Sequence, residues 1–322
     1  MLKSFLLIQE EIAEVESEIM KYVASDVALI PEIGTHIFSS GGKRLRPALL
    51  ILSAKLFQPE SRAYIPLAGV IELIHTATLL HDDVVDRAES RRGVKSVNTV
   101  WGNEAGILAG DFLFAQAFSI LVSVGNLEIL KIIADTVKIM SEGELFQIGL
   151  RHKFDIAEEE YIHQIHSKTA VLISSACRIG ALIGKASRED IQSMGLFGEE
   201  LGIAFQLIDD VFDYSKNTED IGKPVGIDFI EQKVTLPLLF TLKQLNAENR
   251  EKAKAIFDDP SRRHAEFEYI RDLVLKNGGI EFSLSRARHF SEKAKDHIKN
   301  FKDSEEKEAL LEIADYVIER NK

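Results

Sequence analysis

The sequence predicts an all-α protein that folds as one large helical bundle over residues 1–322. Apolar residues recur at intervals of three and four over most of the chain, which is the spacing of one face of an α-helix. The chain has only seven prolines, and no Val/Thr-rich run alternates apolar and polar residues as a half-buried strand would. No Ser/Gly-rich linker or low-complexity tract divides the chain, so we expect a single domain.

The expected helices follow one another with short connections. They cover residues 5–23, 47–57, 65–86, 105–124, 127–149, 160–183, 189–214, 236–245, 250–257 and 267–277, and a charged pair covers residues 278–319. Two stretches, 105–124 and 169–183, are apolar on most of their faces. Helices of this kind belong in the middle of a large bundle, because other helices must cover all of their faces.

Composition narrows the class of protein. The residues are 45% hydrophobic and 28% charged, as in a soluble globular protein, and the net charge of −12 opposes non-specific binding to nucleic acid or to an anionic membrane. No apolar run approaches the roughly 18 residues of a membrane span, and the N-terminus has no signal or transit pattern. Cys177, the one cysteine, excludes an internal disulfide and is interpreted as a buried packing thiol. We expect a cytoplasmic protein.

Two aspartate clusters share one spacing, and each ends a strongly apolar helical stretch: they are Asp82, Asp83 and Asp86, and Asp209, Asp210 and Asp213. Residues three and four apart lie on one face of a helix, where like charges destabilise it unless a cation binds. Oxygen ligands without His or Cys suit Mg²⁺, which shares its coordination shell with substrate phosphates. One cluster alone is equally well explained as a solvated helix end, but the pair predicts a magnesium site.

Basic residues lie in turns near the predicted helix ends. Residues 41–47 place Lys43 and Arg46 just before a helix that Pro47 can begin, so this turn can cradle a diphosphate or can simply be a solvated basic turn. His75 is seven residues before Asp82 and on the same helical face.

Further cations follow the two clusters. Arg91 and Arg92 form a short basic loop after the first cluster, and Lys168 begins an apolar helix. Lys223 and Lys233 flank a Gly-containing loop after the second cluster, which we interpret as a lid. His163 and His166 have the spacing of metal ligands, but the sequence shows no third ligand, so we interpret them as structural.

These motifs resemble, in their order, those of the trans-isoprenyl diphosphate synthases. The motifs that carry the resemblance are Gly-Gly-Lys-Arg-Leu-Arg-Pro (41–47), Leu-Leu-His-Asp-Asp-Val-Val-Asp (79–86), Arg-Arg-Gly (91–93), Gly-Asp-Phe-Leu (110–113), Lys-Thr (168–169), Phe-Gln-Leu-Ile-Asp-Asp (205–210) and Gly-Lys-Pro-Val-Gly-x-Asp (222–228). One departure is Gln232, because the family usually has glycine before the lysine at 233. The resemblance implies an all-helical isoprenoid synthase fold with a central cavity, aspartate motifs facing each other across its mouth, and a homodimer.

The resemblance also implies roles for these residues. Mg²⁺ (about three ions per active site, with Mn²⁺ as a substitute) would bind Asp82, Asp83, Asp86 and Asp209, with auxiliary roles for Asp210 and Asp213. The allylic diphosphate would contact Arg91, Lys168, Thr169, Gln206, Lys223 and Lys233. Isopentenyl diphosphate would contact Lys43, Arg46, His75 and Arg92. The residues expected to carry catalysis are Asp82, Asp83, Asp86, Lys168, Asp209 and Lys223.

The implied reaction is ionisation, condensation and elimination. The diphosphate leaves the allylic substrate, the isopentenyl double bond attacks the resulting carbocation, and a proton is lost, with no side-chain nucleophile. Short-chain members of the family tend to carry an aromatic residue at the fifth position before the first motif, where this chain has Ala77. Thr78 also lies beneath the carboxylates and is small. We therefore expect the chain to grow past both residues, to a floor near 112–118 or 145–146, and to reach a lipophilic, octaprenyl-like product.

Other interpretations remain open at this point. A geranylgeranyl or farnesyl diphosphate synthase differs only in the length of its product. A terpene cyclase normally lacks the second aspartate motif of this type and the Gly-Gly-Lys-x-x-Arg turn, both of which are present. A non-catalytic regulatory subunit would usually have lost one aspartate motif, and a structural helical scaffold would not need so many phosphate-directed cations.

Overall fold

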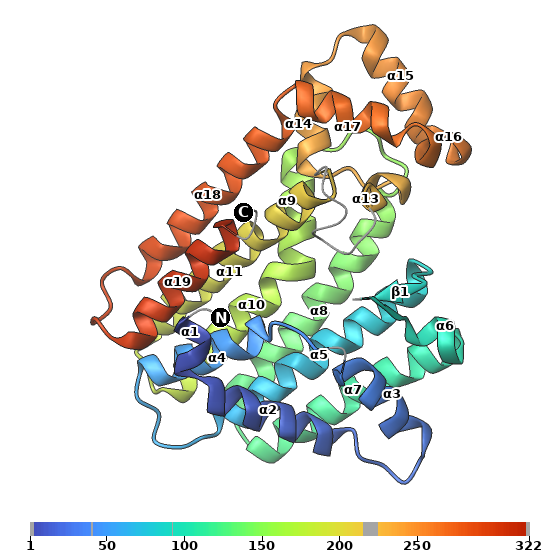
Figure 1. Ribbon diagram of the computed structural model, residues 1–322. Helices are drawn as coiled ribbons and strands as arrows, with labels where there is room; N and C mark the ends of the chain where they lie inside the picture. Colours follow the sequence, from blue (N-terminus) through green and yellow to red (C-terminus); the bar gives the residue numbers. More distant parts are fainter. Residues whose placement is uncertain (1–2, 40, 92, 215–224, 320–322) are drawn as a thin grey trace. The chain divides into compact units, whose positions relative to one another are not determined.

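The computed structural model describes residues 3–39, 41–91, 93–214 and 225–319, and these are almost entirely helical (Figure 1). In chain order the elements are α1 (Lys3–Leu7), α2 (Gln9–Tyr22), α3 (Leu29–Ser39), α4 (Leu45–Leu56), α5 (Tyr64–Val85), β1 (Ser90–Arg91), β2 (Val94–Lys95), α6 (Val97–Trp101), α7 (Asn103–Val124), α8 (Leu127–Leu150), α9 (Glu158–Ile165), the π-helix η1 (His166–Ala170), α10 (Val171–Ile183), α11 (Arg188–Phe212), α13 (Ile227–Ile230), α14 (Leu236–Gln244), α15 (Ala247–Asp258), α16 (Pro260–Ala265), α17 (Phe267–Lys276), α18 (Gly279–Ile298) and α19 (Glu305–Glu319). The all-α prediction is confirmed.

Several predicted boundaries differ from those observed. The helix expected over residues 160–183 is three elements, because a π-helical turn separates α9 from α10. The helix expected to begin at Pro47 begins two residues earlier, at Leu45. The sequence pattern did not indicate the hairpin of β1 and β2, in which Ser90 pairs with Lys95. Strands of two residues are too short to show an alternating pattern.

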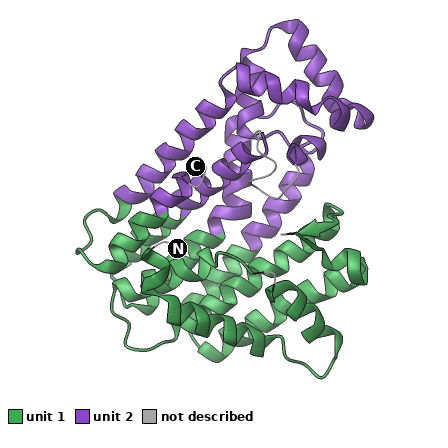
Figure 2. Ribbon diagram, viewed as in Figure 1, with its two compact units in different colours: residues 1–137, 172–198, 297–313 green, residues 138–171, 199–296, 314–322 purple. Residues whose placement is uncertain are grey.

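The chain forms two compact units (Figure 2). Unit 1 comprises residues 1–137, 172–198 and 297–313, and unit 2 comprises residues 138–171, 199–296 and 314–322. The long helices α8 and α11 contribute residues to both units. The boundary therefore follows packing rather than a linker, which is why the composition gave no sign of it.

Helix α5 is the centre of unit 1. It packs chiefly against α7 and also against α4 and α2. Leu67, Ile71, Leu73 and Ile74 on α5 are each no more than 1% exposed. Full burial of such a side chain contributes about 1.5–3 kcal/mol, so α5 holds the first aspartate cluster on a firm support.

Two described helices, α5 and α7, are long and apolar enough to cross a membrane by length and composition alone. The most apolar window of α5 is 72% buried inside the protein, so α5 is explained as a core helix. The corresponding window of α7 is only 22% buried, and α7 exposes Ile107, Leu108 and Val122. The uncovered apolar side chains of α7 therefore need another explanation.

An aromatic cluster forms part of the core of unit 2. The ring of Phe229 on α13 lies 5.8 Å from that of Phe257 and 6.2 Å from that of Phe267, and Tyr214 lies 5.9 Å from Phe267, as measured between ring centroids. These rings attach the short helix α13 to α15 and α17. Because α13 follows the second aspartate cluster along the chain, the aromatic contacts also fix that cluster's surroundings.

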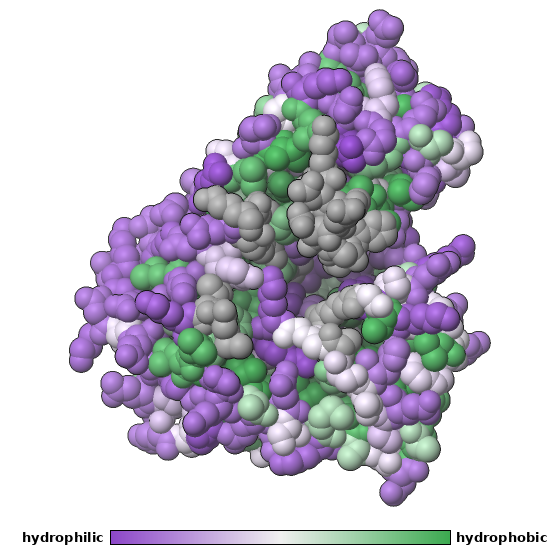
Figure 3. Space-filling model, in the orientation of Figure 1, coloured by the Kyte–Doolittle hydropathy of each residue, from purple (hydrophilic) through white to green (hydrophobic). Residues whose placement is uncertain are grey.

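The molecular surface is mostly hydrophilic on the face shown in Figure 3, with apolar residues in smaller patches. Cys177 is fully buried, and burial raises the pKa of its thiol to about 12. The burial confirms the interpretation of Cys177 as a buried packing residue.

Candidate active site

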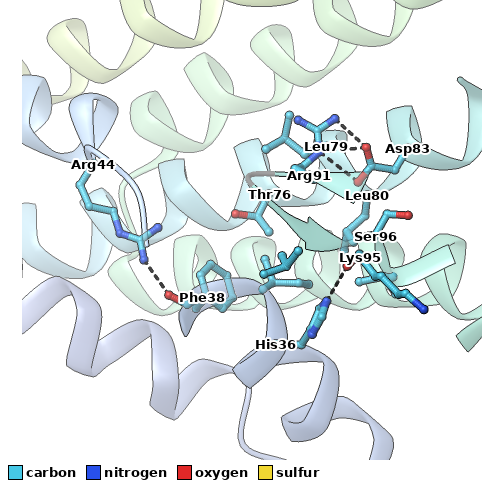
Figure 4. Close-up of a pocket in the computed structure, with 13 residues that line it drawn as sticks. His36, Phe38, Arg44, Thr76, Leu79, Leu80, Asp83, Arg91, Lys95 and Ser96 are labelled. Carbon is cyan, nitrogen blue, oxygen red and sulfur yellow. Dashed lines mark hydrogen bonds and ion pairs between the residues drawn. The ribbon is translucent and has the colours of Figure 1, made fainter. Parts of the chain in front are cut away.

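The first aspartate cluster lies at the C-terminal end of α5. The side chain of Asp83 is 4% exposed and forms a two-pronged ion pair with Arg91, whose Nε and Nη2 lie 2.8 Å and 2.6 Å from Asp83 Oδ1 (Figure 4). Asp82 and Asp86 are half-buried, and Asp86 is the C-cap of α5. The structure thus joins Asp83 and Arg91, which were predicted for metal and for diphosphate, into one group.

Hydrogen bonds hold the hairpin that carries Arg91 and the helix α6 that follows it against neighbouring elements. Asn98 Nδ2 donates to the carbonyl oxygens of Asp83 and Ala88 at 3.3 Å and 3.1 Å. His36 Nε2 on α3 lies 2.7 Å from the carbonyl oxygen of Lys95 on the hairpin (Figure 4). These contacts define the position of Arg91. The neighbouring Arg92, predicted for isopentenyl diphosphate, lies outside the described residues.

A small cavity of about 40 Å³ lies beside the ion pair (Figure 4). Asp83 and Arg91 line it together with apolar side chains such as Phe38 and Leu79. Because one water needs roughly 10–15 Å³ of such volume, the cavity has room for a few waters but not for a prenyl chain.

The predicted chain-length residues Ala77 and Thr78 do not line this cavity. Ala77 is fully buried in α5, and Thr78 is half-buried with its hydroxyl donating to the carbonyl oxygen of His75 at 2.8 Å. Among the residues named as a deeper floor, Leu145 is 70% exposed and Phe146 stacks edge-on against His163. Leu145 is therefore not enclosed by the side chains of its own chain.

The Gly-Gly-Lys turn leads into α4. Arg46 Nη1 donates to His75 Nε2 at 3.1 Å, so the structure brings together two residues predicted for isopentenyl diphosphate. Because an arginine can only donate, Nε2 of His75 is the acceptor and carries no proton in this contact. Lys43 is exposed in the same turn.

The second cluster ends α11, and Asp210 anchors a buried hydrogen-bond chain there. Tyr161 Oη donates to Asp210 Oδ2 at 2.6 Å, and Gln206 Nε2 donates to Asp210 Oδ1 at 2.9 Å. Gln206 Oε1 in turn accepts from Thr169 Oγ1 at 2.8 Å. The chain links η1 to α11 and fixes the side chains of Thr169 and Gln206, both predicted to contact the allylic diphosphate.

Asp213 connects the second cluster to α13. Its two carboxylate oxygens accept from the backbone N–H groups of Ile227 at 3.0 Å and Asp228 at 3.1 Å. The residues of the Gly-x-Asp motif therefore lie beside the cluster. Asp228 was quoted in that motif but was not predicted as a site residue.

The carboxyl groups of the second cluster are buried close to one another, and nearby positive charge offsets their negative charge only in part. Burial, together with the negative charge of Asp228, raises the pKa of Asp210 well above its usual range and that of Asp213 to about 7. Burial also raises the pKa of Asp228, which the nearby charges of Lys233 and Lys168 lower in part. A crowded set of oxygen ligands that resist ionisation is the environment in which a hard divalent cation binds favourably. The residues present thus fit Mg²⁺.

Two of the predicted lysines lie close to these carboxylates. Lys168 Nζ on η1 is 2.8 Å from Glu144 Oε1 and 3.3 Å from Gln147 Oε1, both on α8. Lys233 Nζ is 2.6 Å from Glu231 Oε2. Lys223 lies outside the described residues. Glu144, Gln147 and Tyr161 could not be found by sequence reasoning, because no motif contains them.

No preformed metal site is visible in the part of the chain that the structure describes, where no three His, Cys, Asp or Glu side chains are grouped as metal ligands. His163 packs on Phe146, and His166 Nε2 lies 3.5 Å from Glu199 Oε1. These contacts agree with the structural interpretation of both histidines.

An all-helical chain with two aspartate clusters at helix ends, each accompanied by basic side chains, defines a helical enzyme that acts on diphosphates. The chain belongs to the polyprenyl synthetase family, whose model matches residues 27–274. It is 36% identical over 316 residues to the octaprenyl diphosphate synthase of Escherichia coli K12, with 98% of each chain covered.

Solved structures agree with this assignment. The decaprenyl diphosphate synthase of Rhodobacter capsulatus matches with a TM-score of 0.94 and 34% identity, over 99% of each chain. A polyprenyl synthase of Caulobacter crescentus CB15, complexed with calcium and isoprenyl diphosphate, matches with a TM-score of 0.95 and 35% identity, over 99% of this chain and 97% of that one. The chain is therefore a prenyltransferase, a trans-prenyl diphosphate synthase of a family that is generally Mg²⁺-dependent.

Proposed function

We propose that this enzyme condenses an allylic diphosphate with successive isopentenyl diphosphates to give a medium-to-long all-trans product, octaprenyl-like in length. The observation that carries the proposal is the pair of small side chains, Ala77 and Thr78, beneath the first aspartate cluster. An aromatic residue there would block the growing chain. The octaprenyl and decaprenyl synthases among the relatives support a long product.

We propose that both aspartate clusters bind the allylic diphosphate. Asp82, Asp86 and Asp209 would hold Mg²⁺, which when bound neutralises charge on the departing diphosphate. Arg91, aligned by Asp83, would donate two parallel hydrogen bonds to phosphate oxygens.

The chain's other polar residues would orient this substrate. Lys168 and Lys233 supply positive charge beside the second cluster, and the Thr169–Gln206 pair offers a hydroxyl and an amide whose positions are already fixed. Asp210 and Asp213 would support the cluster through the hydrogen bonds described above. Lys223 would act from the loop outside the described residues.

The isopentenyl diphosphate would bind at the turn before α4. Lys43, Arg46 and His75 carry that assignment, with Arg92 as a fourth member. In this assignment the two substrates use separate sets of cations, so their binding constants should respond to different substitutions. The proton lost at the end would pass to the released pyrophosphate.

We also propose a cytoplasmic homodimer, built on one functional domain that includes both compact units. The apolar residues that α7 leaves exposed support a second copy as the partner. A dimer interface would bury them.

Product analysis tests the proposed function. Purified protein is incubated with labelled isopentenyl diphosphate, Mg²⁺ and dimethylallyl, geranyl, farnesyl or geranylgeranyl diphosphate, and the products are sized by chromatography. Products of about eight isoprene units support the proposal. Products that stop at three or four units would assign it instead as a farnesyl or geranylgeranyl diphosphate synthase. Complete inactivity with every primer would favour a non-catalytic subunit.

A further inference from the structure

We infer that Arg44 and Glu72 are positioning residues, which hold the turn that presents Lys43 and Arg46 to isopentenyl diphosphate. The inference rests on the proposed function of that turn. Neither Arg44 nor Glu72 is available to touch substrate, because each side chain is 5% exposed.

The backbone at Arg44 has a left-handed conformation, which costs free energy for any residue that carries a Cβ. Arg44 is the N-cap of α4, with φ 46° and ψ 37°, in the left-handed region. In this region the Cβ of an L-residue crowds its own backbone, and glycine is the residue ordinarily found. The sequence places arginine there, although two glycines stand directly before Lys43. We expect the side-chain contacts of Arg44 to offset this cost.

Those contacts use most of the guanidinium group. Nη1 of Arg44 lies 2.6 Å from Glu72 Oε1, Nε lies 3.0 Å from Glu16 Oε1, and Nη2 donates to the carbonyl oxygen of Phe38 at 3.4 Å (Figure 4 shows the last). The three acceptors come from α5, α2 and α3. The turn is therefore fastened to three helices through one side chain.

The spacing on α5 explains how this contact sets the direction of the basic side chains. Glu72 and His75 are three residues apart and lie on one helical face. Glu72 binds Arg44, and His75 accepts from Arg46, so α5 holds the turn at two points. Lys43 precedes the inward-pointing Arg44 and remains exposed. If Arg44 left its pocket, the backbone on both sides of it would rotate, and Lys43 and Arg46 would no longer converge on one diphosphate.

A double substitution separates positioning from simple stability. Arg44→Met with Glu72→Leu replaces the buried ion pair by apolar side chains of similar size, a change that leaves many folds equally stable. Methionine gives the left-handed backbone no directional contact. The matched control is Lys55→Met with Glu11→Leu. This ion pair also ties α4 to a neighbouring helix, here α2, at 2.6 Å, but lies at the far end of α4.

The first measurement is steady-state kinetics with each substrate varied in turn. We expect the Arg44/Glu72 double variant to raise KM for isopentenyl diphosphate at least about tenfold, with KM for the allylic diphosphate changed less than about twofold and a Tm close to that of the wild type. The Lys55/Glu11 control should leave both KM values unchanged. An unchanged KM for isopentenyl diphosphate, or equal losses for both substrates that follow a fall in Tm, would overturn the inference.

The second measurement does not depend on catalysis. Trypsin cleaves an exposed turn faster when its backbone is less firmly held, so cleavage after Lys43 should be faster in the double variant than in the wild type or the control. Equal cleavage rates would show that Arg44 and Glu72 do not anchor the turn. If the wild type has no synthase activity but the double variant is still cleaved faster, the proposed function is refuted. The conclusion that Arg44 and Glu72 anchor the turn would then still stand.

Discussion

Individual carboxylates within each cluster have different environments, although the two clusters share a spacing. Asp83 is committed to Arg91, whereas Asp82 and Asp86 are half-buried at the end of α5. In the second cluster, Asp210 accepts from side chains and Asp213 from backbone amides. This leaves Asp82 and Asp86 of the first cluster and Asp209 of the second as the expected metal ligands.

Replacement of the first residue of either cluster should test this division. We expect Asp82→Ala and Asp209→Ala each to lower turnover by at least about a hundredfold, because charge on the leaving diphosphate is no longer neutralised. Circular dichroism should be unchanged, since neither is fully buried. Turnover near that of the wild type in either variant would remove that cluster from the mechanism. Glu10→Ala, at an exposed residue of α2, is a suitable control.

The raised pKa of Asp213 predicts a pH-dependent stability. Its pKa is about 7 in the folded protein against an ordinary value of 3.8, so the metal-free native state binds this proton more tightly than the unfolded chain. The group therefore lowers the free energy of unfolding progressively as pH rises from about 4 to about 7, and no further above that. Asp213→Asn removes the titration and also replaces one accepting oxygen by an amide nitrogen, at a cost that does not depend on pH. The Tm of Asp213→Asn relative to that of the wild type, both in EDTA, should therefore rise across this window.

Mg²⁺ supplies the complementary test, because it favours the ionised carboxylate. The rise in wild-type Tm on addition of Mg²⁺ should increase over the same pH window and should be smaller in Asp213→Asn. A Tm difference between the two proteins that is independent of pH would contradict the assignment.

The sequence motifs indicate which side chains are candidates for the site, but not which other side chains form hydrogen bonds with them. The aspartates, Lys168 and Arg46 follow from motif spacing. Tyr161 is 49 residues from Asp210, and nothing in the sequence links them. Gln232 was noted as a departure from the glycine usual in the family. The structure explains that preference, because residue 232 has φ 59°, and the side chain of Gln232 stabilises this conformation by donating to the carbonyl oxygen of Phe257 at 3.1 Å.

At the scale of elements, the π-helical turn η1 determines where Lys168 and Thr169 point. Sequence periodicity could not predict it, because five residues of π-helix hardly disturb a helical pattern. Helices α8 and α11 each pack closely against η1 at a position where they carry glycine. A Cβ on Gly143 of α8 would lie 2.5 Å from Ser167 Cβ, and one on Gly202 of α11 would lie 2.5 Å from Ala170 Cα.

Gly202→Ala should therefore displace the π-turn. Its new methyl group would meet the backbone of Ala170, which cannot rotate away as a side chain would. We expect a lower Tm and a KM for the allylic diphosphate raised several-fold. Gly149→Ala on α8 is the control, because its Cβ would meet nothing within 4 Å, and alanine favours a helix by about 0.5–1 kcal/mol. Gly202→Ala with wild-type kinetics would show that the turn's position is unimportant.

Helix α5 should also control product length. Ala77→Phe places an aromatic ring one turn before the first cluster, and we expect it to shorten the product by several isoprene units. Because Ala77 is fully buried, Tm must be measured alongside. Thr78→Phe, at a half-buried position, is the companion variant if Ala77→Phe unfolds. Unchanged product length in both folded variants would place the growing chain elsewhere.

For the whole molecule, the charge balance and the uncovered face of α7 predict different behaviour. A net charge of −12 opposes indiscriminate association, whereas the apolar residues of α7 favour one specific contact. Leu108 and Val122 are 66% and 68% exposed and lie fourteen residues apart, close to four helical turns, so they share one face. Fold class and family were predictable from the sequence, but the exposure of the apolar residues of α7 was not. The sequence pattern of an apolar helix is the same whether helices of its own chain or a second copy of the chain cover it.

If α7 forms the dimer interface, charge on this face should separate the protomers. We expect the wild type to sediment as a dimer, and Leu108→Asp with Val122→Asp to sediment as a monomer at micromolar concentration, because each dimer would have to bury four carboxylates without partners. Val27→Asp is the control, since Val27 is 60% exposed but lies outside α7. A monomeric wild type, or a double variant that remains dimeric, would exclude α7 as the interface. Because Leu108 and Val122 lie on the surface, the monomer should keep its circular dichroism, which distinguishes dissociation from unfolding.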